Sequence, residues 1–263
     1  MTKSAENKLI FLIASFCEDS KEWIDVFSSP LPRISGFPKR DKSIRLGISG
    51  LLKKELLDYK EVGETIVIRP TQKAFQMLSL EYPFYNNFIS KWDGKFHLIS
   101  YDLPESNRKI RDGLRWILKS YKLGLLSQSI YVSAYDIKKD LYNNINNKVA
   151  RLHLPSARAD GGQAKDAVSI FTITLNMEQL PQFCKLVWNI DKLNSSYNQI
   201  ISSLNSAISK IKLRRTRIEV FRKSFIEYKK LLESDPGIPF ELIKNENYHL
   251  QIRKLFKKLQ KML

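Results

Sequence analysis

Cysteine is scarce in this sequence of 263 residues, and the motifs that mark common enzymes are missing. The two cysteines, Cys17 and Cys184, lie far apart and form no CxxC pair, which fits a protein of the reducing cytoplasm. No GxGxxG or GxxxxGK motif occurs, so nucleoside triphosphate hydrolysis has no support. No HExxH or paired-carboxylate motif occurs either, and the histidines at 97, 153 and 249 are scattered. We therefore expect a protein that is not an enzyme and that holds no cofactor and no metal.

Long apolar runs are also missing. The first 20 residues contain an apolar stretch, but Ser15 interrupts it and acidic residues close it. The stretch is too short to span a bilayer and has no small-residue cleavage site. We expect no export signal, no membrane anchor and a cytoplasmic location.

Positive charge is abundant, because 44 lysines and arginines face 27 acidic residues and leave a net charge of +17. The excess recurs along the whole chain and favours a polyanionic partner, above all nucleic acid. The densest basic run, residues 210–217, lies in a stretch with a helical pattern. A basic run inside a helix is usually a solvated face, so we assign it no site.

The first 70 residues predict a small helical domain with a hairpin. Residues 4–17 have apolar side chains at helical spacing, and Trp23, Ile24 and Phe27 continue this pattern as a second short helix. A proline-containing connection follows over residues 28–42. Residues 56–71 then predict two short strands joined around Val62, Gly63 and Glu64.

Between the connection and the hairpin, residues 42–54 predict a third helix with two different faces. Its apolar face holds Ile44, Ile48, Leu51 and Leu52. A separate polar face carries Lys42, Arg45, Ser49 and Lys53. Two helices, a basic helix and a hairpin are the order of a winged helix-turn-helix, in which the third helix enters the major groove of DNA and the hairpin contacts the backbone beside it. We predict these four polar residues as the DNA-binding residues.

The middle of the chain alternates strands and helices in the order βαββαβ. Strands are expected at 97–103, within 123–135 and at 167–177, with helices after Pro104 and over 137–154. This order predicts a ferredoxin-like domain, whose uncovered sheet face is often a dimer interface. Beyond residue 178 the pattern is helical. We therefore expect an α+β protein with a winged-helix domain and its connector at 1–90, a ferredoxin-like dimerisation domain at 91–178 and a helical domain at 179–263.

Asp102 at the end of the first central strand raises an alternative. A carboxylate there could bind a divalent metal in a nuclease, but magnesium requires several oxygen ligands, and only Glu105 and Asp136 are candidate neighbours. The same aspartate can instead accept backbone N–H bonds at the start of the following helix. We favour this scaffolding role and keep catalysis by Asp102 as the alternative.

Three separated stretches resemble the PaaX family of bacterial transcriptional repressors. The central WDGKFHLISYDLPESNRKIRDGLRWILKSYKLGLLSQSIYVSAYD is similar to the family's tryptophan, strand, Asp-x-Pro-Glu, arginine-rich helix and "Q-S-hydrophobic" strand. LVWNIDKLNSSYNQII resembles its Trp-x-hydrophobic-Asp-x-Leu…Tyr motif, and SDPGIPFELI resembles the segment near its end. Arg45 stands where the family usually has an arginine in its recognition helix.

This resemblance implies a homodimeric repressor that binds double-stranded DNA and is released by a small-molecule effector, an aromatic acyl-CoA in the founding branch. The central YDLPE and QSIYV also resemble the small CRISPR-associated ferredoxin-like nuclease. That second resemblance implies a metal-dependent nuclease or nucleic-acid-binding subunit, in which Asp102 matches the aspartate proposed to bind the metal. A protein-interaction scaffold without a role on nucleic acid is the third class that remains open.

Overall fold

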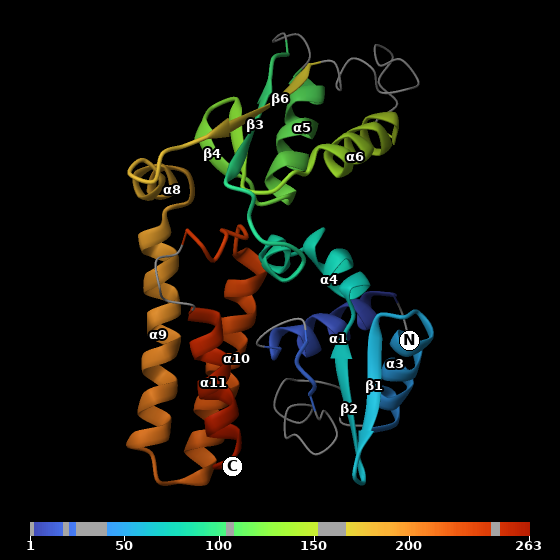
Figure 1. The fold of residues 1–263 in the computed structure, drawn as a ribbon, viewed down its shortest axis with the longest axis vertical. Helices are drawn as coiled ribbons and strands as arrows, with labels where there is room; N and C mark the ends of the chain where they lie inside the picture. Colours follow the sequence, from blue (N-terminus) through green and yellow to red (C-terminus); the bar gives the residue numbers. More distant parts are fainter. Residues whose placement is uncertain (1–2, 18–20, 25–40, 104–107, 152–166, 243–247) are drawn as a thin grey trace. The chain divides into compact units, whose positions relative to one another are not determined.

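The computed structural model describes the chain except for residues 1–2, 18–20, 25–40, 104–107, 152–166 and 243–247 (Figure 1). The chain forms two compact units. Unit 1 comprises Met1–Ser90, Lys192–Asp235 and Ile243–Leu263, and unit 2 comprises Lys91–Asp191 and Pro236–Leu242. Helices occur together with antiparallel sheets, which confirms the predicted mixed α+β class.

The first part of unit 1 contains two helices and a hairpin. They are α1 (Lys3–Ser15), α3 (Asp41–Lys53), β1 (Leu57–Val62) and β2 (Thr65–Pro70). In α1 the apolar side chains at helical spacing, among them Leu9 and Ile13, are buried. The hairpin pairs Val62 with Thr65, and Gly63 in its turn has φ 61°, a conformation that glycine adopts without a Cβ clash.

The prediction of a second helix through Trp23 and Ile24 is wrong where the structure describes it. Ile24 instead forms an isolated antiparallel bridge with Ile68 of β2, through N–H···O bonds of 2.8 and 2.9 Å. Phe27, the last residue of that pattern, lies outside the described residues. Ile24 therefore extends the edge of the hairpin sheet.

An aromatic connector follows the hairpin, in α4 (Gln72–Ser79) and the 3-10 helix η1 (Pro83–Phe88). Thr71 caps α4 by accepting a hydrogen bond from the backbone N–H of Ala74 at 3.2 Å. Phe75 stacks on Phe88 with ring centroids 5.1 Å apart, and the Tyr85 hydroxyl donates to the Phe11 carbonyl at 3.3 Å. The connector thus packs against α1.

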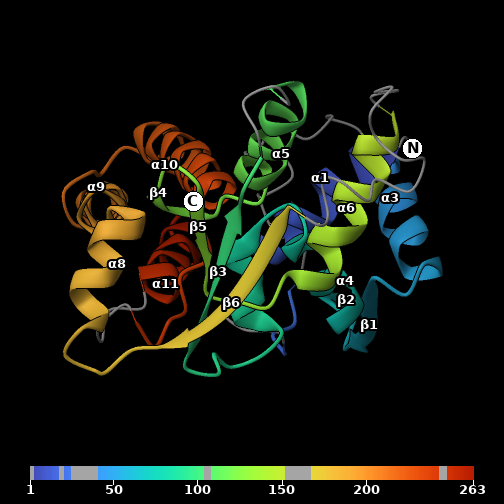
Figure 2. The same ribbon diagram turned by 90° about the horizontal axis from the view of Figure 1, so that it is seen from above.

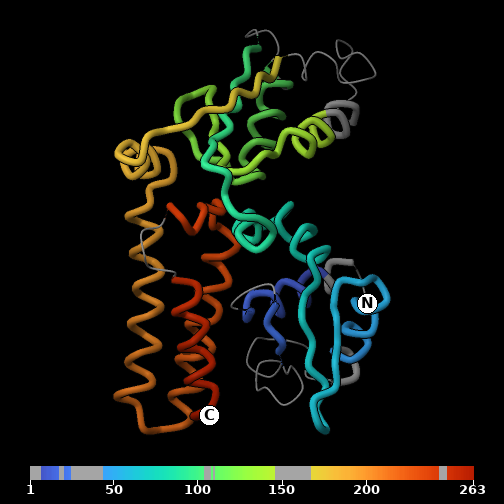
Figure 3. Tube along the Cα trace, in the orientation of Figure 1, coloured from blue at the N-terminus to red at the C-terminus, as the bar shows by residue number. Residues whose placement is uncertain are grey.

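The remaining helices of unit 1 are α9 (Ile190–Ser209), α10 (Arg214–Ser234) and α11 (Tyr248–Gln260), which confirms the predicted helical character of this region (Figure 3). The interpretation of the basic run 210–217 as part of a continuous helix is wrong, because residues 211–213 are not helical and separate α9 from α10. The basic run therefore spans a turn and the first residues of α10.

A layer of phenylalanines joins these helices to α1. The Phe16 ring lies 4.8 Å from that of Phe225 and 6.1 Å from that of Phe256, and Phe221 lies 5.0 Å from Phe256. All four side chains are buried. Aromatic burial on this scale dominates packing energetics, so α1 and the C-terminal helices share one core.

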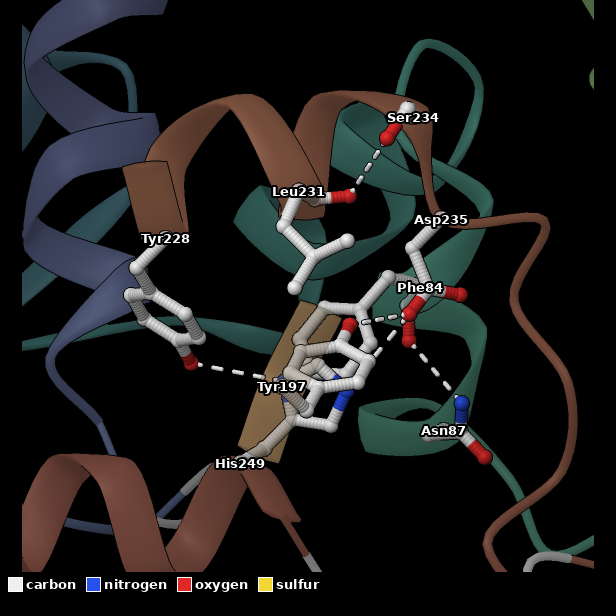
Figure 4. A network of polar contacts seen from close by, with 8 residues as sticks. All are labelled: Phe84, Asn87, Tyr197, Tyr228, Leu231, Ser234, Asp235 and His249. Atoms are coloured by element: carbon white, nitrogen blue, oxygen red, sulfur yellow. Dashed lines mark hydrogen bonds and ion pairs between the residues drawn. The ribbon is translucent and has the colours of Figure 1, made fainter. Parts of the chain in front are cut away.

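A buried polar network lies between the C-terminal helices (Figure 4). The Tyr197 hydroxyl donates to Asp235, whose Oδ2 is 3.6 Å from His249 Nε2, and the Tyr228 hydroxyl lies 3.4 Å from His249 Nδ1. Burial lowers the pKa of His249 to about 4, and the positive charge of Arg253 acts in the same direction. The imidazole is therefore neutral near pH 7, with Nδ1 as the acceptor from Tyr228 and the proton on Nε2.

Arg253 is a buried cation beside this network, with 1% of its surface exposed. Its Nε donates to the Ser15 carbonyl at the end of α1, at 3.1 Å. Its guanidinium carbon lies 5.1 Å from the Phe88 ring centroid and 5.6 Å from that of Phe84. Both aromatic faces favour the charge, so Arg253 links α11 to α1 and η1.

Unit 2 is built on a four-stranded antiparallel sheet in the order β4-β5-β3-β6. Its elements in chain order are β3 (Lys95–Tyr101), α5 (Arg108–Ser120), β4 (Gly124–Ser127), β5 (Ile130–Ser133), α6 (Lys138–Arg151), β6 (Val168–Thr174) and α8 (Leu180–Trp188). The predicted order of strands and helices is thus observed, apart from residues 152–166, which are not described.

Different helices pack on the two faces of this sheet. On one face Ile99 and Tyr101 of β3 pack in a core with Ile110 and Leu114 of α5 and Leu141 of α6. Because side chains alternate along a strand, Phe96 points to the other face, where it meets α8. Figure 2 shows β3 and β6 side by side, with α6 and α8 on opposite sides of them.

Helix α8 lies very close to β4. A Cβ atom on Gly124 would be 2.0 Å from Val187 Cγ1 and 2.6 Å from Trp188 Nε1, so only glycine fits at this position. Phe96 adds ring contacts with Phe183 and Trp188 at 5.0 and 5.9 Å. These contacts fix α8 over one end of the sheet face. No helix in the described ranges is long and apolar enough to cross a membrane.

The buried His249 gives a testable pH dependence of stability. Its pKa is about 4 in the folded protein, against 6.5 ordinarily, so acid favours the unfolded chain, which takes up the proton first. Stability from this group is complete above pH 6.5 and is lost as the pH falls toward 4. Urea unfolding should show a loss of roughly 2 kcal/mol between pH 7 and pH 5. This loss should shrink in His249→Gln and persist in His97→Gln; equal losses in both variants would contradict the assignment.

Candidate nucleic-acid interface

Helix α3 presents an apolar face and a polar face, as its sequence predicts. Ile44, Ile48 and Leu51 are buried. Arg45, Ser49 and Lys53 are exposed at positions i, i+4 and i+8. This spacing aligns them along one side of the helix. The structure therefore brings three of the four predicted DNA-binding residues into one solvent-facing stripe.

The cations of this stripe are available to a ligand. Neither Arg45 nor Lys53 forms an ion pair or hydrogen bond with any residue in the described part of the chain. Lys42 belongs to the first turn of α3, but its side chain is outside the described residues. An unpaired guanidinium can give two hydrogen bonds to guanine, whereas a lysine better suits phosphate.

The sequence patterns did not single out one exposed residue of α3. Leu46 follows Arg45 and is 63% exposed. Its exposure could have been predicted, because Leu46 lies outside the arc of the helix that Ile44, Ile48 and Leu51 occupy. An apolar side chain beside an arginine suits contact with the methyl group of thymine in a major groove.

The hairpin is braced by Trp23. The Lys60 ammonium lies 4.5 Å from the centroid of the Trp23 ring, and the Arg69 guanidinium carbon lies 4.6 Å from it. Arg69 also forms a 2.9 Å ion pair with Asp58, its cross-strand partner. These contacts hold Lys60 at the hairpin surface, where it is exposed.

The tip of the hairpin is acidic. Glu61 and Glu64 flank Gly63, and all three are exposed. Carboxylates at this position repel phosphate, so Lys60 rather than the tip is the hairpin's candidate for a backbone contact. Most of the phosphate contacts that tight binding to DNA requires must then come from surfaces other than the hairpin.

Asp102 lies at the end of β3 with its side chain exposed. Its backbone N–H donates to the Ala167 carbonyl at 3.0 Å. Glu105, a predicted neighbour, and the first turn that Asp102 could cap fall within 104–107, outside the described residues. Asp136 accepts a 2.9 Å bond from the backbone N–H of Lys138 at the start of α6.

Groups that could hold a metal or act as a nucleophile do not gather in the ranges that the structure describes. No three His, Cys, Asp or Glu side chains come together there. His97 and His249 are buried in different units. Burial raises the pKa of Cys184 to about 11, so it remains a thiol rather than a reactive thiolate.

The basic side chains of α5, which include Arg108, Arg111, Arg115 and Lys119, are partly neutralised. Arg108 and Arg115 each lie 3.8 Å from a carboxylate oxygen of Asp112. Arg115 Nε also donates to the Tyr101 hydroxyl at 2.8 Å, a bond that raises the pKa of Arg115. Helix α5 therefore carries less free positive charge than its sequence indicates.

The sheet face opposite α5 and α6 has an apolar part that includes Phe171 and Leu98. Phe171 of β6 is 58% exposed and pairs with Leu98 of β3. Leu98 also pairs with Val132 of β5 on its other side. Two residues along β3, on the same face, Ser100 pairs with Ser169 of β6 and with Ile130 of β5. An exposed aromatic ring on such a face is typical of a protein interface.

Comparison with known proteins identifies the central segment. Residues 90–169 match the family described as "PaaX protein central Cas2-like domain". No curated protein shows a significant match. Among solved structures, the uncharacterized protein Rv0674 from Mycobacterium tuberculosis is 12% identical, with a TM-score of 0.45 over 99% of this chain and 95% of that chain, a likeness too low to bear on function. The resemblance of the central stretch to the PaaX family is thereby confirmed, since residues 90–169 match the family's central domain.

Proposed function

We propose that this chain is a DNA-binding transcriptional regulator of the PaaX type, a homodimeric repressor that acts in the cytoplasm. The observation that carries the proposal is the exposed, unpaired basic stripe of α3, in a chain with a PaaX central domain. Helix α3 enters the major groove of double-stranded DNA. There Arg45 reads a base edge, and Lys42, Ser49 and Lys53 contact the backbone or neighbouring bases.

The winged helix-turn-helix interpretation is supported by the order of elements in unit 1. Helix α3 is followed directly by the β1–β2 hairpin, and Ile24 adds a third strand segment to it. The hairpin then lies beside the groove and contacts the backbone through Lys60. The effector of the founding branch, an acyl-CoA-like small molecule, is part of the proposal through the family alone.

The ferredoxin-like interpretation and the dimer are supported by unit 2. Its sheet order β4-β5-β3-β6, with α5 and α6 on one face, is what a βαββαβ chain forms in that fold. The open face around Phe171 pairs with its copy. A two-fold dimer presents two α3 helices, so the target is an inverted repeat with half-sites one helical turn, or a multiple, apart.

The nuclease alternative lacks a supporting constellation in the described residues. Asp102 supplies one carboxylate, and a magnesium site needs several oxygen ligands in near-octahedral geometry. We therefore do not propose catalysis as a second function.

Arg45→Ala tests the DNA-reading role. The duplex for this test is the discrete site recovered with the protein from its native cell. Loss of a bidentate base contact should weaken binding to that site by roughly 1–3 kcal/mol, with less effect on random duplex. Fluorescence anisotropy measures both affinities. Lys139→Ala, an exposed lysine of α6, is the matched control, and an unchanged affinity of Arg45→Ala for the site would refute the assignment.

Phe171→Glu tests the dimer. A charge on this open sheet face, at the edge strand β6, should shift the protein to monomers in sedimentation velocity and abolish tight binding to the inverted repeat. Because Phe171 is largely exposed, the thermal midpoint should change little. Leu80→Glu, which alters an exposed leucine of unit 1, should remain dimeric; a dimeric Phe171→Glu would place the interface elsewhere.

Asp102→Ala tests the rejected nuclease. Wild-type protein incubated with DNA or RNA and magnesium or manganese should leave both polymers intact, and the variant should behave identically. Gel analysis of labelled substrates provides the measurement. Cleavage that disappears in Asp102→Ala would establish the enzyme in place of the regulator.

A further inference from the structure

The basic run 210–217 lies at one end of the three C-terminal helices rather than along a helix. Lys210 and Lys212 belong to the turn between α9 and α10, and Arg214 and Arg215 open α10. All four side chains are exposed. Arg217 holds the turn in place, because its Nε donates to the Ile211 carbonyl at 2.7 Å. The cations are therefore presented by a defined turn.

The C-terminal end of α11 lies at the same end of these helices. Tyr228 of α10 neighbours His249 of α11, and further along Phe221 neighbours Phe256. The two helices are thus antiparallel, so the first turn of α10 is level with the residues that follow Phe256. Lys258 and Lys261 are exposed there. We call the set Lys210, Lys212, Arg214, Arg215, Lys258 and Lys261 the basic bundle end.

Little negative charge offsets this patch. The segments 206–217 and 248–263 contain no aspartate or glutamate. In the described part of the chain, Arg215 forms a 3.5 Å pair with Glu219, and Lys210, Lys212 and Arg214 pair with no carboxylate. Leu213, which precedes α10, has no side-chain group to cap the helix, so the positive end of the helix dipole adds to the field.

Contacts within unit 1 connect the patch to the hairpin. Lys257, beside Lys258, pairs with Glu22. The next residue, Trp23, holds Lys60 and Arg69 of the hairpin. Through these contacts and the phenylalanine layer against α1, the basic bundle end belongs to the same packed body as α3.

We propose that the basic bundle end is a second surface for duplex DNA, which binds backbone phosphates outside the base pairs read by α3. The proposal rests on the DNA-binding function proposed above and extends the footprint of each protomer. It also supplies the phosphate contacts that the acidic tip of the hairpin does not. The contacts carry no base preference, so they raise affinity for every sequence equally.

Duplex fits this patch better than single strands. Single-stranded nucleic acid is bound by exposed aromatic side chains on which bases stack. Among the described residues of α9, α10 and α11, the exposed large apolar side chains are Ile226 and, at the turn, Leu213, and none is aromatic. The aromatic rings of these helices are in the core. Charge without a stacking surface is the pattern of backbone binding.

The test is the charge reversal Lys212→Glu/Arg214→Glu, compared with Lys138→Glu/Lys139→Glu on α6, which changes the net charge equally. Anisotropy with a random-sequence DNA duplex, the recovered specific site and an RNA duplex gives affinity against salt. For DNA, the slope of log K on log salt should fall by about 2 in the patch variant, since two phosphate contacts are lost. The ratio of specific to random affinity should not change. Glutamate favours a helix N-terminus, so α10 should stay folded, and a thermal scan with the milder Lys212→Gln/Arg214→Gln verifies this.

Each outcome separates this proposal from the function on which it rests. If wild type binds DNA and Arg45→Ala weakens the specific site, but the patch variant matches the α6 control, the second surface is refuted and the function stands. A loss confined to the RNA duplex overturns the proposal in favour of RNA. If wild type binds no DNA, the proposed function fails and the second surface fails with it.

Discussion

The contact on which unit 1 depends is that of Arg253 with the end of α1. A guanidinium that is almost fully buried is costly unless its surroundings favour the charge. Here it donates to the Ser15 carbonyl and lies over the faces of Phe84 and Phe88, with Asp235 in the neighbouring network. Ser15 and Arg253 are 238 residues apart in sequence. Their packing makes the first and last helices of the chain one body.

This shared core connects the C-terminal helices mechanically to α3. Helix α3 packs near α1, and α1 ends in the phenylalanine layer with Phe225 and Phe256. A displacement of α10 or α11 therefore also displaces α1, on which α3 packs, because close-packed interiors transmit strain instead of absorbing it. The C-terminal helices are thus in a position to influence α3, the helix proposed to read DNA, without any contact to bases of their own.

Local patterns in the sequence predicted the elements whose cause is local. The faces of α3 follow from the spacing of Ile44, Ile48 and Leu51, and the hairpin from Gly63 between β-branched residues. Long-range packing decided what the sequence did not reveal. Ile24 looked helical but bonds to Ile68, 44 positions later in the numbering, and no local pattern in the sequence indicated that Arg253 is buried.

The turn between α9 and α10 shows the same limit and bears on the candidate site. Residues 210–213 contain no proline or glycine, so propensity alone continues the helix through them. The packing of Phe221 and Phe225 of α10 against α11 and Phe16 instead fixes a separate helix. The basic run 210–217 lies at one end of the three C-terminal helices only because the chain turns between α9 and α10.

Pairing, not composition, decides where the net charge of +17 acts. On α5, Arg108 and Arg115 share Asp112, and Arg115 also bonds to Tyr101. On the hairpin, Glu61 and Glu64 lie on either side of the turn. Arg45 and Lys53 on α3 have no such partner among the described residues, nor do Lys212 and Arg214 at the bundle end. Unscreened cations attract a polyanion most strongly where their fields add. Both of these surfaces lie in unit 1, so the body that would read a duplex is also the body that would grip it.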